Sequence, residues 1–258
     1  MAPDREITPS GFERQLRWLR DSGFQCLSSH QLLAHLRGTN PAPKKSVVIT
    51  FDDGYADNWV YAFPLLKKYQ ARAIIFVVTG SLNTTSRCRM TSPEGGRILD
   101  TRSAERAEAG FLNWDEVKNM VNSGLVEIGS HTHTHRDFIG NSTYKDLAQE
   151  LRQSRLAIET HAKFPPALFA WPWGEFKNEW LPLLRDAQYQ MAFTTRVGPN
   201  TPGTDPLQIQ RFKVQQEDIG WLRRRLWLYR QPMLAKVYAR TYGLDRRIKA
   251  AIRGSRNS

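Results

Sequence analysis

The chain has 258 residues, of which 40% are hydrophobic, and this is enough apolar sequence to build one large folded core. No run approaches the roughly 18 apolar residues that a membrane span needs, and the first six residues lack the apolar core of a signal peptide. Cys26 and Cys88 have no metal-like spacing and imply no disulfide framework, so we expect a cytoplasmic protein.

The formal net charge of +12 is concentrated at one end of the chain. Between Leu222 and Ser258 there are eleven Lys or Arg residues and one acid, Asp245, so everything before this stretch is nearly neutral. We therefore expect one folded domain over residues 1–218 and a basic segment over residues 219–258.

Helical and strand patterns alternate along the folded part of the chain. Apolar residues at helical spacing predict helices, and short apolar runs between turn residues predict strands. The predicted helices cover residues 8–20, 29–38, 58–69, 143–161 and 179–187, with one more beginning at residue 113. The predicted strands cover residues 47–51, 71–79, 125–128, 167–170, 190–195 and 208–214. This order indicates an α/β fold with a mostly parallel sheet or barrel.

Two helix starts and one long loop have sequence signals of their own. Ser10 with Glu13, and Asn113 with Glu116, each match a capping box, in which two side chains satisfy main-chain N–H groups at a helix start. Residues 83–110 break the helix–strand rhythm with polar residues and a Gly-Gly pair. We interpret them as a long loop on the face where active-site loops gather.

The strand predicted over residues 47–51 runs directly into two acids, Asp52 and Asp53, and then Gly54. Neighbouring strand residues point to opposite faces, so the two carboxylates have different roles unless the strand ends there, as Gly54 would allow. Adjacent carboxylates repel each other unless a cation or a proton separates their roles. The alternative is an ordinary Asp-Gly turn or helix cap.

Three histidines, His131, His133 and His135, directly follow the strand predicted over residues 125–128. His131 and His135 are four residues apart and lie on one side if the chain turns helically there. Neutral imidazole is a good zinc ligand, and a carboxylate is a frequent third ligand beside an open position for water. Because the acids and the histidines both follow strand ends, we predict a metal site of two histidines and one aspartate, with a chance surface cluster as the alternative.

A third motif follows the strand predicted over residues 167–170, and together the three motifs resemble those of the polysaccharide deacetylase family, carbohydrate esterase family 4 (NodB homology). The resemblance covers roughly residues 10–214. It rests on Thr50-Phe51-Asp52-Asp53-Gly54, His131-Thr132-x-x-His135 and Trp171-Pro172-Trp173-Gly174. It implies a distorted (β/α)7-type barrel that hydrolyses the N-acetyl group of an amino sugar with the help of a metal.

The resemblance also implies the metal ligands and the base. Asp53, His131 and His135 match the ligands of a divalent metal, for which zinc is expected first and cobalt, nickel or manganese are alternatives. Such a metal polarises an amide carbonyl and activates water. Asp52, left uncoordinated, matches the general base that accepts a proton from that water.

Further positions match the groups around the substrate. Trp173 stands where the family offers a main-chain N–H to the developing oxyanion. Trp171 and Pro172 match the walls of the substrate groove, and Tyr55 completes the predicted substrate-binding set. Thr132 matches the residue that supports the histidine loop by hydrogen bonding.

Two departures from the family pattern affect the base and the acid. The third motif usually opens with an arginine that positions the catalytic aspartate, and Ala170 stands there instead. The last motif usually ends in a histidine that serves as general acid, and Arg211 stands at that place; an arginine stays charged and cannot donate usefully. We predict that Arg211 is the missing partner of Asp52, with a strand-edge salt bridge as the alternative. The acid is then His133, by elimination, or a water.

The basic segment interleaves aromatic and aliphatic residues with arginines, a pattern that suits a helix lying on an anionic membrane surface. One alternative is that residues 219–229 pack on the barrel as its last helix. Nucleic-acid binding ranks last, because a deacetylase-like domain supplies no reason for it.

The main functional hypothesis is a cytoplasmic N-deacetylase of a cell-surface polysaccharide or lipid-linked glycan, placed peripherally at the inner face of the membrane. A secreted peptidoglycan or chitin-type deacetylase is one alternative, because family members usually have a strand before the first helix and a start further upstream would leave export open. The other alternative is a catalytically silent member that binds a glycan or a metal.

Overall fold

The computed structural model describes residues 7–84, 87–92, 110–139 and 144–241. The predicted loop over residues 83–110 is therefore described only in part, and the basic segment beyond residue 241 lies outside the described residues.

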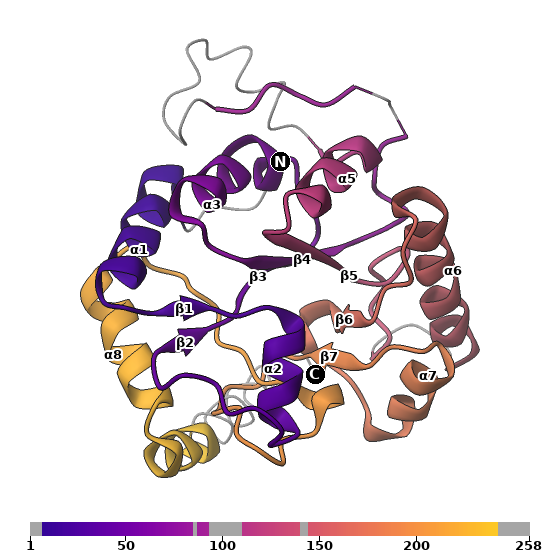
Figure 1. The fold of residues 1–258 in the computed structure, drawn as a ribbon. Helices are drawn as coiled ribbons and strands as arrows, with labels where there is room; N and C mark the ends of the chain where they lie inside the picture. Colours follow the sequence, from indigo (N-terminus) through magenta and orange to yellow (C-terminus); the bar gives the residue numbers. More distant parts are fainter. Residues whose placement is uncertain (1–6, 85–86, 93–109, 140–143, 242–258) are drawn as a thin grey trace, which may run out of the picture.

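The described chain forms two parallel sheets that curl around a common interior (Figure 1). The larger sheet has the order β3-β4-β5-β6-β7, with strands at Ile49–Phe51, Ala73–Val77, Val126–Ser130, Leu168–Ala170 and Met191–Phe193. The smaller sheet pairs β1 (Gln25–Cys26) with β2 (Ser46–Val47), and only Val48 separates β2 from β3. This open, curled parallel sheet with helices around it confirms the predicted α/β barrel class.

Helices lie around the larger sheet. In Figure 1, α3, α5, α6 and α7 lie outside the row of strands, while α1 and α8 lie side by side beyond the smaller sheet. The helices cover Pro9–Asp21 (α1), Ser29–Leu36 (α2), Phe63–Tyr69 (α3), Trp114–Asn122 (α5), Tyr144–Ala162 (α6), Leu181–Asp186 (α7) and Ile219–Tyr229 (α8). A further helical stretch covers residues 232–241.

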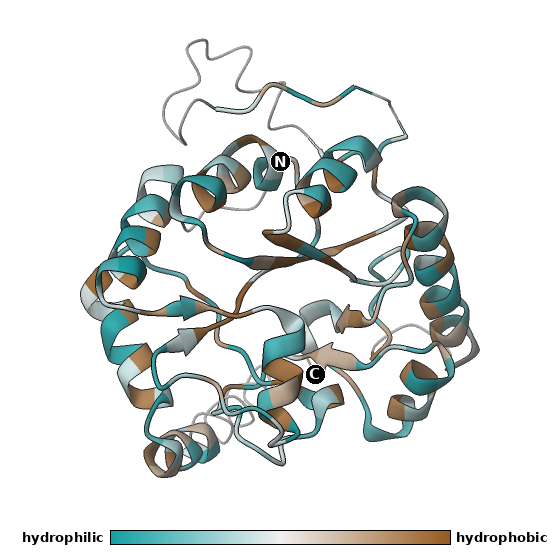
Figure 2. Cartoon of the chain, viewed as in Figure 1, coloured by the Kyte–Doolittle hydropathy of each residue, from teal (hydrophilic) through white to brown (hydrophobic). Residues whose placement is uncertain are grey.

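The central strand β4 shows how the sequence builds two cores. All five of its residues are buried, and successive side chains of a strand point to opposite faces. Ile75 and Val77 pack outward in a cluster with the helices α1, α3 and α5. Ile74 and Phe76 pack inward in a cluster with three leucines of α2. Hydrophobic colour accordingly follows the strands and the inward sides of the helices (Figure 2). The interior is therefore a packed core, and polar chemistry is confined to the strand ends.

Two local predictions are wrong: one names the wrong cap for a helix, and the other predicts a strand that does not form. Helix α1 begins at Pro9 with Thr8 as its cap, not at the Ser10–Glu13 pair, because proline at the first helical position needs no hydrogen-bond partner for a missing N–H. The chain over residues 208–214 forms no regular strand. Residues 206–208 make a 3-10 turn, and the following segment joins β7 only through the bridge between Phe193 and Ile209.

Other boundaries agree with the sequence or refine it. The Asn113–Glu116 capping box is present, with both reciprocal hydrogen bonds. The helix predicted over residues 58–69 begins as a π-helical turn at Asn58–Ala62 and continues as α3, with Pro64 in its first turn. In the described part of the chain, no helix is long and apolar enough to cross a membrane.

Helix α8 packs on the folded domain, as the alternative for residues 219–229 predicts. Leu222 and Leu226 are buried against Leu19 of α1, with Phe212 and Trp221 packed beside them. Asp218 caps the helix by accepting hydrogen bonds from the first main-chain N–H groups. This part of the basic segment is therefore anchored to α1.

Candidate active site

The acidic pair follows from the way β3 ends. Ile49 and Phe51 pack outward against the helices, so the residues that alternate with them, Thr50 and Asp52, belong to the inner face of the sheet. Asp53 then adopts a left-handed backbone conformation with φ of 71°, which ends the strand. The turn gives the two carboxylates different neighbours, so they can take different roles.

Arg211, which follows β7 in the chain, forms an ion pair with Asp52 at the end of β3. Its two terminal nitrogens donate to the two Asp52 oxygens at 2.7 and 2.9 Å, a bidentate ion pair. Arg211 also donates to the Thr50 hydroxyl at 3.1 Å and to the carbonyl of Thr194 at 2.9 Å. Its guanidinium lies over the inward-facing ring of Phe76. The arginine is thus held by several fixed partners, and it holds the carboxylate in turn.

This ion pair sets the protonation state of Asp52. Burial raises the pKa of the carboxyl, but the charge and hydrogen bonds of Arg211, with the neighbouring imidazoles, outweigh it, and the net pKa lies below its ordinary value. Asp52 is therefore ionised at neutral pH, as a proton acceptor must be. Ala170, which replaces the usual arginine, is fully buried and leaves this place to Arg211.

The histidine loop, residues 131–135, starts at the carboxyl end of β5. His131 is 2% exposed, and its Nδ1 lies 2.8 Å from the carbonyl oxygen of Ala170. Thr132 takes a φ of 68°, and its hydroxyl accepts a hydrogen bond from the main-chain N–H of His135 at 3.0 Å. The loop thereby turns both imidazoles to the same side.

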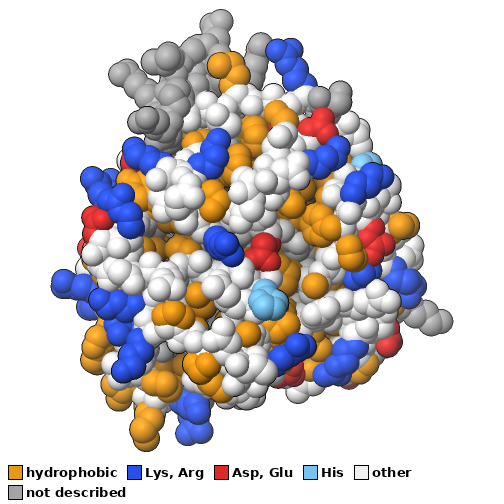
Figure 3. Space-filling model, viewed as in Figure 1, with side chains coloured by type: hydrophobic (Ala, Val, Ile, Leu, Met, Phe, Trp, Pro, Cys, Tyr) orange, Lys and Arg blue, Asp and Glu red, His pale blue; other side chains and the backbone are white. Residues whose placement is uncertain are grey.

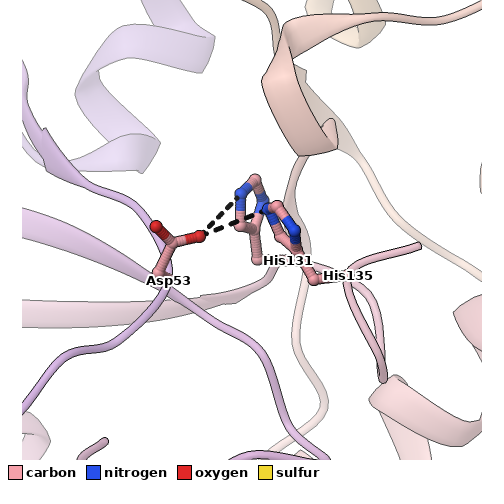
Figure 4. A group of neighbouring side chains, drawn as sticks. All are labelled: Asp53, His131 and His135. Carbon is pink, nitrogen blue, oxygen red and sulfur yellow. Dashed lines mark ion pairs between the residues drawn. The ribbon is translucent and has the colours of Figure 1, made fainter. Parts of the chain in front are cut away.

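Asp53, His131 and His135 meet in one group (Figure 4). The Asp53 Oδ1 atom lies 3.5 Å from His131 Nε2 and 3.3 Å from His135 Nε2. In the described part of the chain, this is the group of three ligand-type side chains whose donor atoms all lie within 4.8 Å of one another.

The donor set fits a tetrahedral metal such as zinc. Ligands about 2.0–2.1 Å from a tetrahedral ion lie about 3.4 Å apart, close to the separations from Asp53. The Ala170 carbonyl fixes the His131 ring, with Nε2 toward Asp53, as the hydrogen-bond partners of metal-binding histidines commonly do. Burial and the neighbouring His131 lower the pKa of His135, so its ring is neutral and free to coordinate at pH 7.

Glu150 of α6, which the sequence motifs did not indicate, fixes the histidine loop by hydrogen bonds. Glu150 is only 5% exposed, and its carboxylate accepts three hydrogen bonds of 2.6–2.8 Å from the loop. The donors are the main-chain N–H groups of His133 and Thr134 and the Thr134 hydroxyl. Its position in the helix could have indicated this role. Glu150 lies next to Leu151 on the buried face of α6, and a buried acid needs a fixed hydrogen-bond partner.

The third motif places one exposed aromatic beside the site. Trp173 is 53% exposed, has a φ of 53°, and packs edge-on against His135 with ring centroids 4.4 Å apart. Trp171 is 1% exposed and stacks on Phe176 in the core, and Pro172 is buried too. Trp171 and Pro172 are therefore part of the core under the third motif, and neither offers the accessible groove wall that the resemblance implied.

Tyr55 and His133 are near the strand ends, but each contacts a residue outside the ligand group. Tyr55 stacks on Phe111 with ring centroids 5.1 Å apart, and burial together with the charge of Asp53 raises the pKa of its phenol. Tyr55 is therefore a neutral hydrogen-bond donor. The Nδ1 of His133 lies 3.0 Å from the Thr79 hydroxyl, after β4, so this ring turns away from the ligand group toward Thr79.

Left-handed backbone conformations concentrate at these strand ends. Four of the seven described non-glycine residues with positive φ are Asp53, Thr132, His135 and Trp173. Such conformations cost about 1–3 kcal/mol each and persist where surrounding contacts enforce them, commonly at functional sites. The strained loops and the candidate ligands coincide.

Comparison with known proteins identifies the family. The sequence model of the family described as polysaccharide deacetylase matches residues 39–192, more than half of the chain. The chain belongs to the polysaccharide deacetylase family. The matched range includes the acidic pair, the histidine loop and the third motif, and it ends before Arg211.

Curated relatives carry one recurring name. Poly-beta-1,6-N-acetyl-D-glucosamine N-deacetylase of Escherichia coli (strain K12) is 28% identical over an alignment of 218 residues, gaps included, that covers 74% of this chain and 31% of the relative. The protein of the same name from Staphylococcus aureus (strain MRSA252) is 26% identical over 228 residues, covering 85% of this chain and 71% of the relative. This family member thus spans about a third of the length of the Escherichia coli protein.

Solved structures support the same fold. IcaB from Ammonifex degensii superimposes with a TM-score of 0.70 at 25% identity, covering 89% of this chain and 93% of that one. The Streptococcus pyogenes deacetylase PplD, solved in complex with acetate, has a TM-score of 0.65 at 24% identity and covers 83% of this chain and 87% of that one. The barrel fold is therefore that of deacetylases.

Proposed function

We propose that this chain is a metal-dependent N-deacetylase that hydrolyses the acetamide of N-acetylglucosamine units in a β-1,6-linked polysaccharide. The observation that carries the proposal is the meeting of Asp53, His131 and His135 beside an ionised Asp52 that Arg211 holds. The sugar and its linkage come from the names of the relatives, and a peptidoglycan or chitin-type glycan is the second substrate class.

The residues divide the chemistry among them. Asp53, His131 and His135 would hold a divalent metal, zinc in the first place, which polarises the acetamide carbonyl and activates water when bound. Asp52 accepts a proton from the attacking water, and Arg211 keeps its carboxylate ionised and fixed in direction. The main-chain N–H of Trp173 donates to the developing oxyanion.

Collapse of the tetrahedral carbon breaks the C–N bond and releases acetate and the amine, which needs one proton. Water is the first candidate for that proton, and His133, whose ring contacts Thr79 rather than the ligand group, is the side-chain alternative. If His133→Ala leaves turnover unchanged, the proton comes from elsewhere. The ring faces Thr79, so Thr79→Ala is the companion variant that frees it without removing it.

Acetate release from a β-1,6-linked N-acetylglucosamine oligomer tests the proposal. Asp52→Asn should lower turnover by about 10²–10⁴-fold, the usual contribution of a general base, while the metal content stays unchanged. Asp186→Asn, at an exposed acid on α7, is the matched control and should keep full activity. Bound metal without acetate release from this oligomer, or from peptidoglycan and chitin oligomers, would favour a silent glycan- or metal-binding member.

A further inference from the structure

The last described part of the chain exposes apolar side chains that the folded domain does not use. Trp227 on α8 is 55% exposed, and Met233, Leu234 and Val237 on the next helix are 83%, 50% and 59% exposed. These four are half of the eight large hydrophobic residues exposed in the described part of the chain, and they fall within eleven residues. Such a concentration of exposed apolar residues marks an interaction surface.

One side of the helix over residues 232–241 packs on the folded domain, and another side is exposed to solvent. Ala235 is fully buried, and the ring of Tyr238 packs against that of Tyr229 on α8. With about 100° of rotation per residue, Met233, Val237 and Leu234 fall on one arc of about 100°, away from Ala235. The anchoring side thus orients the apolar arc toward solvent.

Positive charge borders the apolar arc and no acid interrupts it. Residues 222–241 contain six Lys or Arg residues and no Asp or Glu. By the same rotation, Lys236 and Arg240 lie beside Met233 at the edge of the arc. In Figure 3, hydrophobic side chains gather over α8 and the following helix, with Lys and Arg side chains around them.

We infer that α8 and the helix over residues 232–241 form a docking surface for an anionic lipid bilayer. The apolar arc of the helix over residues 232–241, together with the exposed Trp227 of α8 and the basic side chains around them, matches the boundary between acyl chains and anionic headgroups. A symmetric second copy would bring six positive charges against six, which is unfavourable. A nucleic acid would leave the aliphatic arc without a partner. The surface is argued independently of the deacetylase reaction.

Vesicle flotation of the full chain tests the apolar arc. The protein should float with phosphatidylcholine vesicles that contain phosphatidylglycerol, and not with phosphatidylcholine alone. The variant M233S/L234S/V237S should lose flotation, while Leu156→Ser, at a 63%-exposed leucine on α6, should behave as the parent protein. Circular dichroism checks that both variants are folded.

The charges are tested by a matched pair of variants and by salt. R223Q/K236Q/R240Q should weaken binding to anionic vesicles about a hundredfold, at about fivefold per charge, and added salt should do the same for the parent protein. The control R152Q/K177Q/R185Q removes three exposed charges from α6, α7 and the turn before α7, and should leave binding unchanged.

Three outcomes would overturn the inference. One is that the parent protein floats equally with neutral and anionic vesicles, or that M233S/L234S/V237S floats with anionic vesicles as well as the parent does. A second is self-association of the parent chain, abolished by the triple-serine variant, without any vesicle binding. The third is binding of an oligonucleotide duplex without vesicle binding. Acetate release measured on the soluble oligomer is unaffected by these variants, so this inference and the proposed function can fail separately.

Discussion

The ion pair between Arg211 and Asp52 gives a quantitative prediction. Breaking a buried ion pair costs about 3–5 kcal/mol, because one charge remains buried without its partner. The Arg211 side chain is 13% exposed but that of Asp52 is 33% exposed, so water screens part of the interaction. We therefore expect Arg211→Gln to lower the free energy of unfolding by about 2 kcal/mol, or the melting temperature by about 4–8 °C.

A double-mutant cycle in urea measures the pair itself. Parent protein, Asp52→Asn, Arg211→Gln and the double variant should give a coupling free energy of about 1.5–2 kcal/mol, since other contacts of each residue cancel in the cycle. Arg185→Gln, at an exposed arginine on α7, should change stability by less than about 0.5 kcal/mol. A coupling below about 0.5 kcal/mol would refute the view that Arg211 holds Asp52.

The pH dependence of the same pair has a definite sign. The folded-state pKa of Asp52 lies below its ordinary value of about 3.9, so its contribution to stability is present above about pH 4 and is lost as the pH falls through the folded pKa. The stability difference between the parent and Arg211→Gln should therefore shrink below about pH 4. In activity, loss of the arginine raises the pKa of the base, so the acidic limb of the kcat/KM profile should move to higher pH.

Three further predictions concern neighbouring residues. Trp171→Ala should lower the free energy of unfolding by about 3–5 kcal/mol because the side chain is buried, whereas Trp173→Ala should cost less than about 1 kcal/mol and impair turnover; equal losses in urea unfolding would contradict this. Glu150→Gln should weaken zinc affinity about 10–100-fold in calorimetry, because an amide cannot accept all three loop hydrogen bonds; unchanged affinity would reject the role. Burial raises the pKa of Tyr189 to about 12, so the free energy of unfolding should fall between about pH 10 and 12, and Tyr189→Phe should flatten that fall.

The sequence predicts the site well where chemistry follows a strand end. Two acids follow β3 and a histidine cluster follows β5, and only β4 separates these two strands in the parallel sheet. Their carboxyl ends therefore lie at the same edge of the sheet, and the meeting of these residues follows from the topology. Arg211 could also be placed, because the resemblance left Asp52 without its usual partner and an arginine stood in the last motif.

What the sequence does not predict depends on packing. Nothing in the Trp-Pro-Trp motif tells which indole is buried, and the structure turns Trp171 into the core and Trp173 outward through a left-handed conformation at residue 173. The segment after β7 has strand-like composition, but it pairs through isolated contacts and bends to bring Arg211 inward. Glu150 belongs to none of the motifs, although it follows the histidine loop by fewer than twenty residues, and its contact with that loop depends on how α6 packs against it.

The central claim is that a metal held by Asp53, His131 and His135 is required for deacetylation, and one titration tests it most directly. Acetate release from a β-1,6-linked N-acetylglucosamine oligomer is measured after chelation and during stepwise addition of zinc. We expect no acetate from the chelated protein and full recovery at one zinc per chain, with no recovery in H131A/H135A. Acetate release that persists after complete removal of metal, or recovery by zinc in the double variant, would contradict the account.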